Sequence, residues 1–124
     1  MASAYLKKTD IGNVHIAPRW DFEQFLVEAV LFINHGGQNS IASGLIHGVP
    51  QIIVPGKIFE RRFNATCVAE NKAGVVVDDQ NLRADHISQV AERIIASREF
   101  SENAAALGKK LSEAGGLNTL IKNV

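Results

Sequence analysis

Residues 31–55 carry the clearest fold pattern of this chain. They are Leu31-Phe-Ile-Asn-His-Gly-Gly-Gln-Asn-Ser-Ile-Ala-Ser-Gly-Leu-Ile-His-Gly-Val-Pro-Gln-Ile-Ile-Val-Pro55. Apolar runs stand at both of its ends, and a glycine turn and a segment of helical periodicity lie between them. This order predicts a strand, a turn, a helix and a second strand, the unit from which parallel sheets are built. A histidine and two glycines fall where the first strand gives way to the helix.

That junction is suited to bind a phosphate. Ligands of parallel sheets gather outside the carboxyl ends of the strands, and the first turn of a helix offers unpaired N–H groups and a partial positive charge. Gly36 and Gly37 leave the backbone open to an oxyanion, and His35 supplies a directed donor. Asn39 and Ser40 add side-chain donors one step into the helix. A second interpretation of His35 is that it only caps the turn.

Short apolar runs alternate with longer helical segments along most of the chain. Consecutive apolar positions in the strands indicate helices on both faces. The sequence therefore predicts an α/β fold, a partial Rossmann-like parallel sheet of about four strands. We expect Gly48 and Gly74 to end two helices, Ser101 to cap another and Gly115-Gly116 to end it. The expected strands lie near 13–17, 30–34, 51–54 and 75–78, and the helices near 22–29, 38–47, 60–72, 83–97, 101–111 and, as a last turn, 117–122.

Composition narrows the function classes. The chain has 124 residues, enough for one domain, and its 13 basic and 13 acidic residues give a formal charge of zero. Nothing therefore points to nucleic acid or to an anionic membrane as a partner. The first residues, Met1-Ala-Ser-Ala-Tyr-Leu-Lys-Lys8, lack the apolar core expected of a secretory signal, and no apolar run approaches the roughly 20 residues that span a bilayer. The lone Cys67, among apolar neighbours, is expected to pack as an ordinary core residue in a cytoplasmic protein.

The chain resembles the second half of a domain. Residues 1–12 look like a polar stub, and residues 13–124 carry the strands and helices of a partial binding domain. Strands missing from such a sheet leave an unpaired edge and apolar surface. We therefore expect either a homo-oligomer or a partner chain that completes the sheet.

Several motifs follow one another along the chain: Asn13-Val14, His35-Gly36-Gly37-Gln38-Asn39-Ser40, Gly48-Val49-Pro50, Pro55, Glu60, Asn64-Ala65 and Gly74. Together they resemble the donor-binding signature of GT-B-fold glycosyltransferases, in the branch of the UDP-glycosyltransferases and macrolide glycosyltransferases. The resemblance runs from about Asn13 to the C-terminus and covers the later part of that family's C-terminal domain.

The resemblance implies a role for each matching residue of a nucleotide-sugar site. His35 and the backbone of Gly36 and Gly37 bind the donor diphosphate, and Asn39 with Ser40 binds the phosphate nearest the nucleoside. Glu60 binds sugar hydroxyls, with Arg61 beside it. Arg19 or Trp20 flanks the base, and Ser43 faces the ribose.

This chain departs from the family pattern at three places. Ser43 stands where a glutamate commonly binds the ribose, which leaves UDP and dTDP open as the nucleotide. Arg61 stands where a glutamine is usual, which favours a donor with a carboxylate. The segment 55–60 is one residue longer than the commonest form.

The family's chemistry is inverting sugar transfer, without a cofactor or an obligatory metal. The general base lies in an N-terminal acceptor domain, so this chain holds no catalytic residue and is expected to be inactive alone. One alternative is a non-catalytic nucleotide-binding or interaction module of the same fold, which Ser43 and Arg61 allow. Another is a GT-B enzyme that isomerises a nucleotide sugar, although the Asn-Ser and Gly-Val-Pro spacing fits transferases better.

Three residues have a simpler structural interpretation. His47, in the last turn of a helix before Gly48, is expected to complement the helix dipole. A solvent-exposed charged turn is as good an interpretation of Glu60 as sugar binding. Packing within its loop is as good an interpretation of Trp20 as contact with the base.

Overall fold

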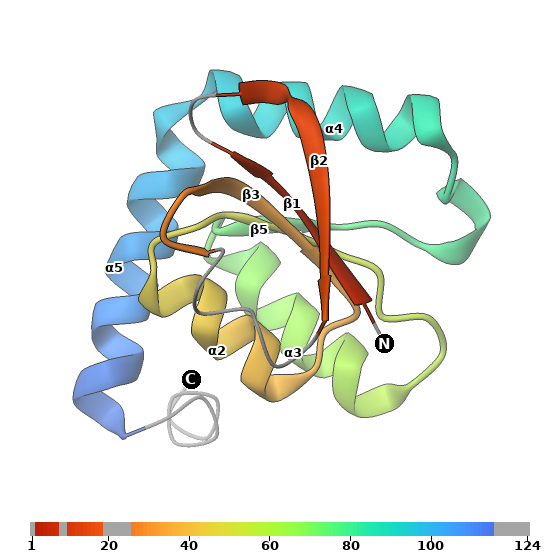
Figure 1. Ribbon diagram of the computed structural model, residues 1–124. Coiled ribbons are helices and arrows are strands. Elements are labelled where there is room, and N and C mark those ends of the chain that lie inside the picture. The colour runs from red at the N-terminus through yellow and green to blue at the C-terminus, as the bar shows by residue number, and fades with distance from the viewer. Residues whose placement is uncertain (1, 8–9, 19–25, 116–124) are drawn as a thin grey trace.

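The computed structural model describes residues 2–7, 10–18 and 26–115, with side chains from residue 26 onward (Figure 1). Five strands form one sheet in the order β2-β1-β3-β4-β5. The strands are β1 (Ala2–Lys7), β2 (Asp10–Pro18), β3 (Ala29–Asn34), β4 (Gln51–Ile53) and β5 (Gly74–Val76). The helices are α2 (Gln38–Ile46), α3 (Phe59–Glu70), the 3-10 turn η2 (Asp79–Asn81), α4 (Ala84–Ala96) and α5 (Arg98–Ala114).

The parallel part of the sheet consists of β3, β4 and β5, and helices cover both of its faces (Figure 1). Ile53 packs with α2, α3 and α5 in one buried cluster. Its neighbour Ile52 packs with α4 in a second cluster on the other face. Adjacent residues of a strand point to opposite faces, so the apolar pair Ile52-Ile53 serves both clusters. This confirms the α/β class and the helices on both faces.

The amino-terminal part of the sheet differs from the expectation. Residues 1–12 were expected to be a polar stub, whereas β1 forms there and runs antiparallel to both β2 and β3. The sheet is therefore mixed. The segment β1 alternates small, polar and apolar residues and has no apolar run, so its pattern is weak. We attribute the formation of β1 to strand pairing, because β1 hydrogen-bonds to an edge of β3 that would otherwise stay open.

Residues in the left-handed conformation follow three of the helices. Gly48 and Gly115 take left-handed φ angles of 69° and 84° after α2 and α5, as expected. Gly74 was expected to end α3, but Lys72 takes the left-handed conformation there, with φ 54°. Gly74 instead begins β5, where a Cβ atom would collide with the carbonyl oxygen of Gln51.

The last helix begins earlier than expected. Ser97, not Ser101, is the N-cap of α5, and its hydroxyl accepts a hydrogen bond from the Glu99 amide at 3.2 Å. Ser97 has the extended backbone that a cap requires, so the helix starts three residues before Ser101. The expected final turn at 117–122 and the first half of the expected helix at 22–29 lie outside the described residues, and Ala29, the expected end of that helix, begins β3.

Cys67 packs as an ordinary core residue on α3, as expected. Burial raises the pKa of its thiol, and the nearby Glu70 carboxylate adds to the shift. A raised pKa leaves less reactive thiolate at neutral pH.

Candidate functional site

The turn between β3 and α2 presents bare backbone at the carboxyl edge of the sheet. Gly36 has φ 90°, a conformation that favours glycine. Gly37 is the N-cap of α2, with no side-chain hydrogen bond to the first helical turn. His35 is exposed, and no hydrogen bond or ion pair joins it to another described residue. The amino end of α2 is thus open to an external acceptor.

A buried chain of amide groups fixes this turn from behind. Asn34 accepts a hydrogen bond from the Gly36 amide at 2.9 Å, and its Nδ2 donates to Oε1 of Gln51 at 2.8 Å. Gln51, fully buried, donates in turn to the Ile41 carbonyl oxygen at 3.0 Å. Asn64 of α3 donates to the Gly36 carbonyl oxygen at 3.3 Å. These bonds tie the turn to β4, α2 and α3.

The Ser40 side chain gives the strongest indication of a ligand at this turn. It is only 8% exposed, and its hydroxyl has no hydrogen-bond partner in the described part of the chain. The hydroxyl oxygen lies 4.0 Å from the place of a Cβ atom on Gly37, so it is close to the open turn. Buried polar groups are normally hydrogen-bonded. A buried donor at an uncapped helix end is thus suited to an oxyanion.

The other residues of α2 that were expected in the donor site lie on the same face of the helix as Ser40. Asn39 is exposed in the first turn, and Ser43 is partly buried one turn further on. Residues three and four apart lie on one helix face, so Ser43 continues the face of Asn39 and Ser40. Arg19 and Trp20, expected near the base, lie outside the described residues.

The first turn of α3 lies at the same edge, because β3 and β4 are parallel and each is followed by its helix (Figure 1). Glu60 is exposed there, and Arg61 is partly buried. Gly36 packs against Arg61: a Cβ atom on Gly36 would lie 3.0 Å from the Arg61 carbonyl oxygen and 3.3 Å from its Cβ. The expected diphosphate and sugar residues therefore meet along one edge.

His47 has the structural role expected of it. Its Nδ1 lies 2.9 Å from the Ser43 carbonyl oxygen. A carbonyl oxygen only accepts, so Nδ1 carries the proton and donates. His47 thus satisfies a carbonyl group near the end of α2.

Two residues that support the site, Asn34 and Gln51, were not among those predicted from the sequence. Asn34 ends β3 and Gln51 begins β4, and an amide next to an apolar run is the only signal that the sequence offers. Nothing in a single sequence states that two amides 17 residues apart are hydrogen-bonded.

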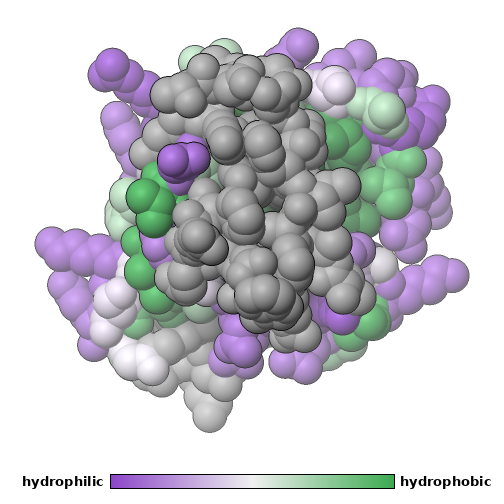
Figure 2. Space-filling model, viewed as in Figure 1, coloured by the Kyte–Doolittle hydropathy of each residue, from purple (hydrophilic) through white to green (hydrophobic). Residues whose placement is uncertain are grey.

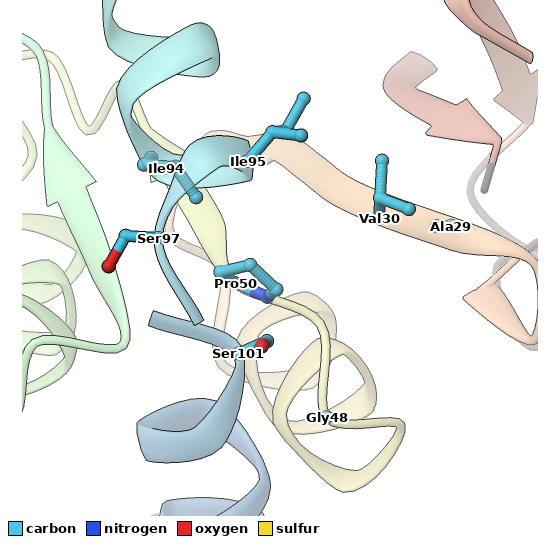
Figure 3. A pocket seen from close by; sticks show the side chains of 8 residues that line it. All are labelled: Ala29, Val30, Gly48, Pro50, Ile94, Ile95, Ser97 and Ser101. Atoms are coloured by element: carbon cyan, nitrogen blue, oxygen red, sulfur yellow. The ribbon is translucent and has the colours of Figure 1, made fainter. Parts of the chain in front are cut away.

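A pocket of about 310 Å³ lies at the opposite edge of the sheet, between the starts of β3 and β4 and the junction of α4 with α5 (Figure 3). Its walls are largely apolar, formed by residues such as Val30, Pro50 and Ile95. Of its two hydroxyl groups, Ser97 caps α5 and Ser101 donates to the Arg98 carbonyl oxygen. Since the described residues bring no polar side chain other than these two serines to the pocket, it is not the candidate site.

Two classes of feature are missing from the described residues. No three His, Cys, Asp or Glu side chains come together there as a metal site. No helix in that part of the chain has both the length and the apolar character that crossing a membrane requires.

The chain is similar in sequence to glycosyltransferases. The chain is 33% identical over 115 residues to the UDP-N-acetylglucosamine--N-acetylmuramyl-(pentapeptide) pyrophosphoryl-undecaprenol N-acetylglucosamine transferase of Moorella thermoacetica, covering 90% of this chain and 31% of that protein. It is 28% identical over 93 residues to the NDP-glycosyltransferase YjiC of Bacillus subtilis, covering 75% of this chain and 24% of that protein. The chain thus spans less than a third of the length of these relatives.

A solved structure shows the same fold. The glycosyltransferase VinC, crystallised in complex with DTDP, superposes with a TM-score of 0.68 at 27% identity, covering 71% of this chain and 22% of VinC. The family model of the Erythromycin biosynthesis protein CIII-like C-terminal domain matches residues 7–114. The chain therefore belongs to the Erythromycin biosynthesis protein CIII-like C-terminal domain family, a C-terminal domain of GT-B-fold glycosyltransferases.

Proposed function

We propose that this chain binds the nucleotide-sugar donor of an inverting glycosyltransferase through the turn between β3 and α2. The observation that carries the proposal is the Ser40 hydroxyl, which is buried and has no partner among the described residues, at the amino end of α2. An oxyanion there accepts hydrogen bonds from that hydroxyl and from the backbone N–H groups of the first turn. The bound DTDP of VinC, a structural neighbour, supports a nucleoside diphosphate as the ligand.

The roles along the edge follow the resemblance. His35 and the backbone of Gly36 and Gly37 hold the diphosphate, and Asn39 with Ser40 holds the phosphate nearest the nucleoside. Glu60 binds sugar hydroxyls. Ser43 faces the ribose, where a small hydroxyl accommodates either UDP or dTDP, and Arg19 with Trp20 flanks the base.

This chain supplies one part of the transfer mechanism. In an inverting transfer, the acceptor hydroxyl attacks the anomeric carbon as its bond to the diphosphate oxygen breaks, and a base takes the acceptor proton. The α2 amino end and His35 stabilise the negative charge on the departing diphosphate. In this proposal the base for the acceptor comes from the acceptor-binding part, so this chain by itself binds donor without turnover.

An acceptor-binding domain or partner chain completes the site in this proposal. The relatives are more than three times as long as the segment they share with this chain. Beside the site, Ile58, Phe59 and Phe63 are 49%, 81% and 50% exposed, and the two phenylalanine rings stack with centroids 6.4 Å apart. Figure 2 shows mostly hydrophilic groups around the margin of one face, with several hydrophobic groups among them. We propose that the acceptor-binding part covers these three side chains.

Replacing His35 with alanine tests the diphosphate role. We expect the affinity for UDP or dTDP to fall by roughly 1 to 3 kcal/mol, the range for loss of a hydrogen bond to a charged group. Isothermal titration calorimetry measures the change, on protein whose oligomeric state has been determined by light scattering. His86→Ala is the matched control, since His86 lies on α4 across the sheet. Equal affinities of His35→Ala and the control would remove His35 from the site.

A further inference from the structure

Arg61 lies against the turn that holds the proposed diphosphate. Its carbonyl oxygen and Cβ are 3.0 and 3.3 Å from the position of a Cβ atom on Gly36. One turn further along α3, Asn64 donates to the Gly36 carbonyl oxygen and fixes the helix to the turn. The Arg61 side chain therefore starts directly beside the open amino end of α2.

The guanidinium of Arg61 is available to a ligand. No hydrogen bond or ion pair joins it to another described residue, although the residue is partly buried. The adjacent Arg62 is engaged: its Nη1 donates to the Gly56 carbonyl oxygen at 2.9 Å and lies 3.8 Å from a carboxylate oxygen of Asp78. Arg62 thus binds the loop before α3, whereas the Arg61 guanidinium has no partner among the described residues and lies beside the proposed donor site.

We propose that Arg61 is an anion-binding residue of the donor site, whose guanidinium binds a second oxyanion of the nucleotide sugar. The inference rests on the proposed function and adds a charge requirement to it. Guanidinium pairs with phosphate or carboxylate through two parallel hydrogen bonds, which a glutamine at this position cannot match. The oxyanion belongs either to the outer phosphate of the donor or to a carboxylate on its sugar.

Titration calorimetry of wild type, Arg61→Gln and Arg93→Gln tests the proposal. Arg93→Gln is the matched control, because Arg93 is exposed on α4 and its replacement removes the same charge. The ligands are the monophosphate, the diphosphate, the diphosphoglucose and the diphosphoglucuronate of whichever pyrimidine nucleoside the wild type prefers. Arg61→Lys keeps the charge without the paired hydrogen bonds, and circular dichroism verifies that each variant is folded.

Binding to the outer phosphate predicts that Arg61→Gln loses roughly tenfold or more in affinity for the three diphosphate ligands and keeps its affinity for the monophosphate. Binding to a sugar carboxylate predicts the same loss for the diphosphoglucuronate alone. In both cases Arg61→Lys is intermediate and Arg93→Gln matches wild type. If Arg61→Gln binds all four ligands as wild type does, the inference is overturned and the proposed function stands. If folded wild type binds none of them, the proposed function fails as well.

Discussion

Gln51→Leu is expected to lower the free energy of unfolding by about 2 kcal/mol and to weaken nucleotide binding. Gln51 is fully buried and joins the Asn34 amide to the Ile41 carbonyl oxygen. Leucine leaves Nδ2 of Asn34 buried without its partner, at a cost of about 1 to 3 kcal/mol, which the gain in apolar contact offsets in part. The Ile41 carbonyl oxygen loses only its second hydrogen bond, because it keeps its bond in the helical ladder of α2. Asn34 also accepts from the Gly36 amide, so its release loosens the donor turn.

Urea unfolding followed by circular dichroism measures this stability difference. Gln89→Leu is the control, because Gln89 is exposed on α4 and a surface change there is expected to stay within about 0.5 kcal/mol. Equal stabilities of the two variants would show that the buried amide chain does not hold the turn.

Gly108→Ala is expected to cost about 2 kcal/mol of stability by forcing α5 away from α2. A Cβ atom at Gly108 would overlap the Leu45 carbonyl oxygen of α2, and backbone cannot turn aside as a side chain does. Overpacking of this kind costs typically 1 to 3 kcal/mol, with the upper end expected where backbone is the obstacle. The greater helical preference of alanine returns up to about 1 kcal/mol.

Thermal and urea unfolding of Gly108→Ala give the result, with Ser112→Ala as the comparison on the exposed side of the same helix. Ser112→Ala has no neighbour to displace, so it should leave stability within about 0.5 kcal/mol of wild type. A Gly108→Ala protein as stable as wild type would contradict the close approach of α2 and α5.

Periodicity predicted the elements whose burial is strong and failed where burial gives no pattern. β3, β4 and α4 lie within one or two residues of their expected bounds, because runs and stripes of apolar residues follow from packing on both sheet faces. β1 has no such run and forms through pairing with β2 and β3, which is not a local property. The start of α5 was missed because Ser97 and Ser101 are equally good caps by type.

The candidate site could be predicted in its outline. The histidine–glycine turn lies at the junction of β3 and α2, as expected, and the first turn of α3 lies beside it. The binding roles of these residues stay predictions. The supports could not be predicted, since the partners of Asn34 and Gln51 are set by the register of β3 on β4. The spacing of motifs in the sequence predicts the residues of the turn, but it does not predict which buried amides support that turn.

A calorimetric titration of the purified wild-type chain with UDP and with dTDP, with ADP as the control nucleotide, measures whether the turn between β3 and α2 is a donor site. We expect saturable binding of at least one pyrimidine diphosphate at one site per chain, and weaker binding of ADP. A correctly folded chain that binds neither UDP nor dTDP would contradict the claim that the turn between β3 and α2 is a donor site.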